Sequence, residues 1–170
     1  NDEARKLESH ARSLIEKAIV EGKFYVHGEI LDLKYGSAKD KLDEAMKSLV
    51  ESVYSKLNMV NQFVDSDADI LAILNGAYEE VGFTGLGANN EDALNEISQW
   101  LELQNQKMLK TSMGDVQRRY QAIPYGWKEI DIAALIARLI VQQKIQINYG
   151  GAVVGKEERR LVDFLRKKTE

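Results

Sequence analysis

The feature that most constrains the fold of this chain is a change of hydrophobic period near residue 145. In residues 90–141, apolar residues recur every three or four positions in three successive segments, the spacing of helices that bury one face. Residues 145–149 then alternate strictly between apolar and polar, and a glycine pair at 150–151 leads into the apolar run 152–154. Such alternation around a glycine pair predicts an antiparallel hairpin. This part of the chain is therefore expected to form three helices followed by a hairpin.

This order of elements is the layout of a winged helix, a variant of the helix-turn-helix whose third helix can enter a DNA major groove. Asn90 and Ser112 are suitable N-caps for the first two helices, and Pro124 ends the second. The apolar stripe of the third helix covers residues 132–140, and a charged helix is expected over residues 156–169.

The N-terminal half is expected to be helical with one small hairpin. Helical spacing covers residues 3–21, and two β-favouring runs flank His27 and Gly28, where glycine supplies a positive φ for a tight turn. Two further helix starts are marked by Ser-x-x-Asp capping boxes, Ser37 with Asp40 and Ser66 with Asp69.

A loose connection is predicted where glycines gather in residues 76–87, ahead of a pair of asparagines. We therefore place a domain boundary near residue 88. The expected fold class is mainly α with small β-hairpins (α+β). It comprises a helical unit with a small hairpin in residues 1–88 and a winged-helix-like unit with a C-terminal helix in residues 89–170.

Charge is divided unequally along the chain. Residues 1–100 hold 10 Lys and Arg against 19 Asp and Glu, whereas residues 101–170 hold 13 against 8. An acidic surface is repelled by a polyanion, so any nucleic-acid contact is expected after residue 100. The candidate nucleic-acid or partner surface comprises Arg118, Arg119, Lys128, Arg138 and Lys144.

A packing role competes with DNA binding for the third helix. Ile, Leu or Ala fill most of its positions, which leaves too few cations for the several phosphate contacts that specific binding needs. We therefore favour a winged helix that packs inside a larger protein or assembly, and keep a DNA-binding module as the alternative.

No motif indicates a catalytic, cofactor or metal site. The glycine-rich residues 82–87 lack the Gly-Lys-Ser/Thr ending of a phosphate loop. His10 and His27 have no second ligand at metal spacing, and the alternating Asp residues at 65–69 suit a helix start better than a calcium loop. The absence of Cys fits a reducing compartment such as the cytoplasm, and no apolar stretch reaches the roughly 20 residues of a membrane span. A small enzyme with an unrecognised site is the third hypothesis.

Two stretches of the sequence resemble a known family. The first, residues 11–60, includes Phe24-Tyr25-Val26-His27-Gly28-Glu29 and Leu49-Val50-Glu51-Ser52-Val53-Tyr54. The second is Pro124-Tyr125-Gly126-Trp127-Lys128-Glu129-Ile130-Asp131-Ile132-Ala133-Ala134-Leu135. Together they are similar to the BrxC family, also called PglY, the ATPases of BREX phage-defence systems.

The resemblance implies a large parent protein whose N-terminal P-loop region binds ATP and which acts with a methyltransferase and other partners against phage DNA. This sequence contains no Gly-x-x-x-x-Gly-Lys-Ser/Thr, so a downstream, non-catalytic interaction or scaffolding fragment without a cofactor of its own is expected. Its expected partners are other domains of the parent or other defence proteins, with DNA as a further possibility and no membrane. Tyr125 and Trp127 are candidate anchors of the turn before the third helix.

Overall fold

The computed structural model describes residues 2–33, 36–76, 90–158 and 160–166. The chain divides into two compact units, Asn1–Ser55 and Lys56–Glu170. Each unit combines helices with one two-stranded antiparallel hairpin, so the expected mainly α fold with small β-hairpins is confirmed.

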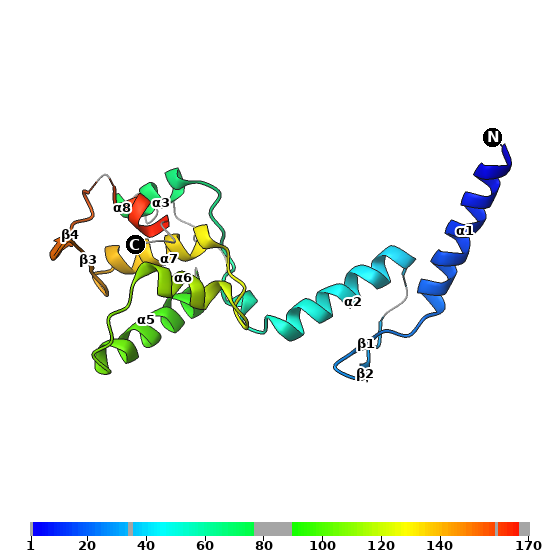
Figure 1. Ribbon diagram of the computed structural model, residues 1–170, viewed down its shortest axis with the longest axis horizontal. Helices are drawn as coiled ribbons and strands as arrows, with labels where there is room; N and C mark the ends of the chain where they lie inside the picture. The colour runs from blue at the N-terminus through cyan, green and yellow to red at the C-terminus, as the bar shows by residue number, and fades with distance from the viewer. Residues whose placement is uncertain (1, 34–35, 77–89, 159, 167–170) are drawn as a thin grey trace. The chain divides into compact units, whose positions relative to one another are not determined.

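The first unit consists of α1 (Asp2–Glu21), β1 (Tyr25–Val26), β2 (Glu29–Ile30) and α2 (Ala38–Val53), which are labelled in Figure 1. The hairpin turns at His27 and Gly28, whose φ angles of 52° and 82° are both positive, as a tight hairpin turn requires. Ser37 and Asp40 form the expected capping box at the start of α2.

The first unit buries little of its apolar surface. No residue of α1 is buried, and Ala45 is the only buried residue among those described between 2 and 55. The large apolar side chains that remain exposed are Leu7, Leu14, Ile15, Val20, Tyr25, Ile30, Leu42, Met46, Leu49 and Val50. The described part of this unit therefore leaves the apolar stripes of both helices open.

The second unit surrounds one central helix. Its elements are η1 (Leu57–Met59), α3 (Asp67–Leu74), α5 (Glu91–Gln106), α6 (Met113–Gln121), α7 (Glu129–Val141), β3 (Ile147–Tyr149), β4 (Ala152–Val154) and α8 (Leu161–Arg166). Helices α3, α5, α6 and α8 all pack against α7, which lies in the middle of this unit in Figure 1. The apolar side chains of α7 are therefore the centre of the core.

The elements of this unit follow the sequence expectations closely. The hairpin of β3 and β4 pairs Ile147 with Val154 and turns at Gly150 and Gly151, whose φ angles are 59° and 84°. The expected C-terminal helix begins later than predicted, because a turn occupies residues 156–157 and α8 begins at Leu161. Capping boxes open α3 and α6, formed by Ser66 with Asp69 and by Ser112 with Asp115.

Residues 56–64 belong to the second unit because their backbone is hydrogen-bonded to it. The N–H of Lys56 donates to the carbonyl of Pro124 at 3.0 Å, and Trp127 Nε1 donates to the carbonyl of Lys56 at 3.0 Å. Further along, the N–H of Val64 donates to Asp131 Oδ1 at 3.0 Å. A buried backbone donor without a partner costs free energy, so these bonds fix the path of the segment.

The side chain of Asn90 also holds this segment in place. It was expected to cap α5, but it makes no side-chain cap hydrogen bond there. Its Oδ1 accepts from the N–H groups of Asn61 and Gln62 at 2.7 and 2.9 Å, and its backbone is left-handed with φ of 56°. The expected division near residue 88 lies outside the described residues. The contacts described here instead place the division after Ser55, ahead of the tied segment.

A cluster of aromatic rings anchors the turn between α6 and α7. Tyr120 stacks on Trp127 with ring centroids 4.9 Å apart, and Tyr125 meets both rings edge to face. Only 3% of the surface of Trp127 and of Tyr125 is exposed. The ring of Trp127 thus joins the turn to the incoming segment through its bond to Lys56.

Truncation of Trp127 tests this packing. Trp127→Ala should lower the free energy of unfolding by about 3–5 kcal/mol, since it removes a buried ring together with its hydrogen bond. Trp127→Phe keeps a ring and loses the bond, so a loss of about 1 kcal/mol is expected beyond the change in volume. Chemical denaturation followed by circular dichroism measures both; a cost below 1 kcal/mol for the alanine variant would contradict the packing.

Candidate partner-binding groove

Helix α7, the third helix of the winged-helix layout, is enclosed on nearly all sides. Its buried residues are Asp131, Ile132, Ala133, Ala134, Leu135, Ile136, Ala137 and Leu139. Seven of these are consecutive and so point in every direction around a helix of 3.6 residues per turn. A helix that reads base edges must keep one face free for the major groove. In this structure the middle of α7 has no such face.

The five basic candidates do not form one cationic surface. Arg118 pairs with Asp115, three residues away on α6. The guanidinium of Arg119 lies 5.1 Å from the ring centre of Trp100 and 4.0 Å from Glu96 Oε1. Both arginines are therefore engaged within their own unit.

The other three candidates are spread along α7, one before its first turn, one in its last turn and one after its end. Lys128 is exposed just before the first turn, with its ammonium 5.5 Å from the ring centre of Phe63. Arg138 is half-buried in the last turn, ten residues or about 15 Å along the helix axis from Lys128. Lys144 follows the helix and is exposed. Of the five, Lys144 alone lines the groove described below.

A charged cluster around Glu96 secures α5 to the turn. Lys56 Nζ lies 2.9 Å from Glu96 Oε2, and the hydroxyl of Tyr125 donates to the other carboxylate oxygen. Burial acts to raise the pKa of Glu96. The hydrogen bonds from Tyr125 and Lys56, with the charges of Lys56 and Arg119, outweigh it and hold the pKa below its usual value. The two cations and the Tyr125 hydroxyl thus hold the Glu96 carboxylate in its ionised form where α5 meets the turn.

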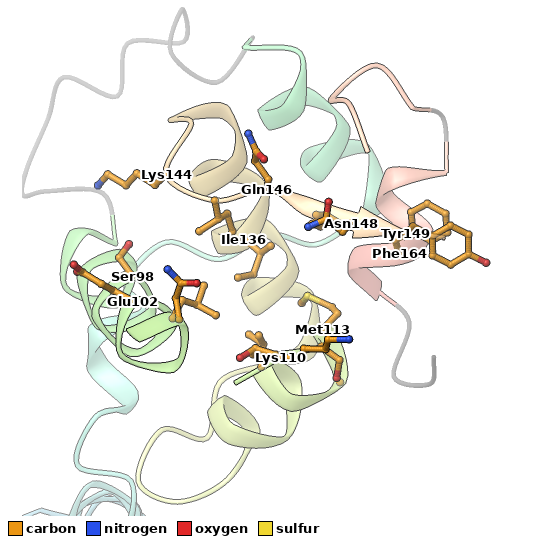
Figure 2. A pocket seen from close by; sticks show the side chains of 18 residues that line it. Ser98, Glu102, Lys110, Met113, Ile136, Lys144, Gln146, Asn148, Tyr149 and Phe164 are labelled. Carbon is orange, nitrogen blue, oxygen red and sulfur yellow. The ribbon is translucent and has the colours of Figure 1, made fainter. Parts of the chain in front are cut away.

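A groove of about 1180 Å³ lies beside α7. One wall is formed by α5 and the segment before α6, and the other by residues 144–149, which run into and along β3. Figure 2 shows Ile136 of α7 on the floor, with Ser98 and Glu102 on one side and Gln146 and Asn148 on the other. The apolar residues of the lining are Leu101, Met113, Val116, Ile136, Ile145, Ile147, Tyr149 and Phe164.

Most polar residues of the lining are exposed and form the rim of the groove, whereas Ser98, Thr111 and Ser112 are half-buried. Glu102, Lys110, Lys144, Gln146 and Asn148 are all exposed. An apolar floor with a polar, solvated rim is the anatomy of a protein-protein contact. The groove is assembled from segments that are far apart in the sequence, so neither its existence nor its lining could be found from spacing. The alternation of residues 145–149 was the one signal that pointed to part of it.

Among the described residues, no group of three His, Cys, Asp or Glu could hold a metal ion. None of the helices within the described ranges is long and apolar enough to cross a bilayer. The predicted phosphate-loop look-alike at residues 82–87 lies outside the described residues.

Comparison with known protein families decides the identity of the chain. The model of the winged helix-turn-helix domain of the BREX ATP-binding protein BrxC matches residues 56–170. The chain belongs to the BrxC family. A second model, of the fourth domain of BrxC with its six-stranded β-sheet, matches residues 1–49. No solved structure matches the chain.

The two BrxC matches fall on the two units of the structure. The first unit ends at residue 55 and the second begins at residue 56, where the winged helix-turn-helix match also begins. The chain is thus a component of a BREX ATP-binding protein, and the resemblance inferred from its sequence is confirmed.

The buried Asp131 gives the stability of the second unit a characteristic pH dependence. Burial raises the pKa of Asp131, and the hydrogen bond from Val64 and the charge of Lys128 only partly oppose it. Because the folded-state pKa is raised, stability is lost as the pH rises from the unfolded-state pKa through the folded-state pKa.

Replacement of Asp131 by Asn tests this effect. Asp131→Asn keeps an oxygen acceptor for Val64 and removes the charge, so the variant should be more stable than wild type at pH 7. The difference should shrink as the pH falls through the raised folded-state pKa and should level off near the unfolded-state value of about 3.9. Asp131→Ala also removes the charge but leaves the N–H of Val64 unpaired, so it should be about 1–3 kcal/mol less stable than Asp131→Asn at every pH. Urea titrations at several pH values compare the three; a gain for Asp131→Asn that is independent of pH would refute the assignment.

Proposed function

We propose that the winged-helix unit of this chain is a non-catalytic interaction domain of a BREX ATP-binding protein, serving phage defence as a scaffold for its neighbours. The enclosure of α7 carries this proposal. A winged helix whose third helix is buried in its own core keeps the architecture of a DNA-binding domain but lacks the exposed surface that contacts bases. The open groove offers an interface of a different kind.

The nucleotide chemistry of the parent protein is assigned to other parts of it. The sequence has no Gly-x-x-x-x-Gly-Lys-Ser/Thr, so no phosphate-binding residue of a P-loop has a counterpart here. The charged cluster around Glu96 joins one carboxylate to two basic side chains, Lys56 and Arg119, and lies among packed aromatic rings. The domain therefore acts by holding surfaces together, with no cofactor of its own.

The first unit is proposed to contribute to the sheet-containing domain of the parent. The matching BrxC domain has a six-stranded sheet, whereas the described part of residues 1–55 holds one two-stranded hairpin. Its exposed apolar stripes, with Leu42, Met46 and Leu49 on α2, are suited to cover such a sheet. The same surface explains why this unit buries so little when taken by itself.

Fluorescence anisotropy of labelled duplex DNA tests the choice between docking and DNA binding. At low salt the 170-residue chain should show no saturable binding, because its basic side chains are dispersed and α7 is enclosed. The triple variant Arg118→Glu, Lys128→Glu, Lys144→Glu is the control and should give the same trace. Binding that falls steeply with added salt and is lost in the triple variant would reverse the conclusion in favour of a DNA-binding module.

A further inference from the structure

We propose that the groove beside α7 receives an extended segment of a partner protein, which adds as a strand to the free edge of β3. The inference rests on the proposed docking function and names the kind of segment that docks. Three features of the groove determine which segment can bind: an unpaired strand edge, an apolar floor and a basic rim.

The free edge of β3 follows from the register of the hairpin. Tyr149 and Ala152 flank the two-residue turn and pair with each other, and Asn148 pairs with Val153. In a hairpin closed by such a turn, the flanking pair exchanges hydrogen bonds and the next pair does not. The peptide N–H and C=O of Asn148 therefore point away from β4, and those of Val153 point away from β3.

The edge that carries the peptide groups of Asn148 faces the groove. The lining includes all three residues of β3, Ile147–Tyr149, and within the described chain it includes no residue of β4. The strand thus lies between its hairpin partner on one side and the groove on the other. An exposed strand edge of this kind is a template for another extended chain, which gains main-chain hydrogen bonds by adding to it.

The floor of the groove supplies pockets for alternate side chains of the added strand. Val116 and Ile136 lie at its base, and Leu101 and Ile145 are half-buried at its sides. At about 1180 Å³ the groove exceeds the roughly 300–1,000 Å³ of small-molecule sites. Its size and exposed rim favour a peptide over a small ligand.

The rim favours acidic residues at the ends of that peptide. Lys110 projects from the wall before α6 and Lys144 from the wall that leads into β3, and both are exposed and labelled in Figure 2. Glu102 is the acidic residue of the lining. An extended segment of alternating apolar and polar residues with acidic ends matches both the edge and the charge.

The test uses a synthetic peptide of that design, Asp-Val-Thr-Val-Thr-Val-Glu, with capped ends and a fluorescent label. Titrated into the 15N-labelled 170-residue chain, it should shift the amide resonances of Gln146 and Asn148 and bind saturably by anisotropy. The same peptide with lysine at both ends should bind more weakly, because the rim is basic. Absence of a shift at Asn148 with millimolar peptide would overturn the proposal.

Two proline variants distinguish strand addition from nonspecific binding of the peptide. Asn148→Pro removes the N–H on the groove edge, and Val153→Pro removes the equivalent N–H on the far edge. Neither of these N–H groups donates a hydrogen bond across the hairpin, so both variants should keep the fold, which the amide resonances of the 15N-labelled variants would show. Asn148→Pro should weaken peptide binding by about tenfold, the loss of one main-chain hydrogen bond, and Val153→Pro should leave it unchanged. Equal effects of the two variants would contradict strand addition.

The outcome for the peptide is distinguishable from the outcome for the docking function. DNA binding by the chain would defeat the proposed function and would be seen without any peptide. An absence of both DNA binding and peptide binding would leave the docking function standing and defeat only the strand-addition mechanism.

Discussion

The burial of α7 is the constraint on which the second unit depends. Ile, Leu and Ala occupy this helix on every side, and a helix that is apolar all round cannot be left on a surface. Its enclosure requires neighbours from both ends of the unit, with α3 on the N-terminal side of the chain and α8 on the C-terminal side. The packing of α3 also explains why residues 56–76 belong with the winged helix and not with the helices that precede them.

Polar contacts set the path of the chain around this apolar centre. Asp131 and Asn90 accept hydrogen bonds from backbone N–H groups of the segment before α3, and Trp127 donates to its first carbonyl. The same residues that close the core thus hold the segment in register. Burial of the Asp131 carboxyl disfavours its charged form and raises its pKa, although the group accepts the hydrogen bond from Val64. With α7 occupied in this way, the surface left for function lies beside it, along β3.

Local features of this fold could be predicted from the sequence, and long-range ones could not. Capping boxes at Ser37 and Ser66, and the glycine pair at 150–151, determine structure within a few residues and are where the sequence placed them. Asn90 was expected to cap its own helix, but its side-chain oxygen accepts from the N–H groups of Asn61 and Gln62, almost thirty positions earlier in the chain. The basic candidates failed to gather for the same reason: whether Arg119 faces solvent or Glu96 is decided by packing between helices. The apolar run of α7 was the signal for the burial of this helix.

Thiol accessibility along α7 tests the central claim most directly, because the chain has no cysteine of its own. Ala133→Cys, Ala134→Cys and Leu135→Cys place buried thiols at successive steps of about 100° around the helix. Ala152→Cys on exposed β4 serves as the reference. We predict that a maleimide labels Ala152→Cys at the rate of an unstructured peptide and labels the three α7 variants only as fast as the unit unfolds. Rapid labelling at any of the three α7 positions in folded protein would show a free face on this helix and contradict the account.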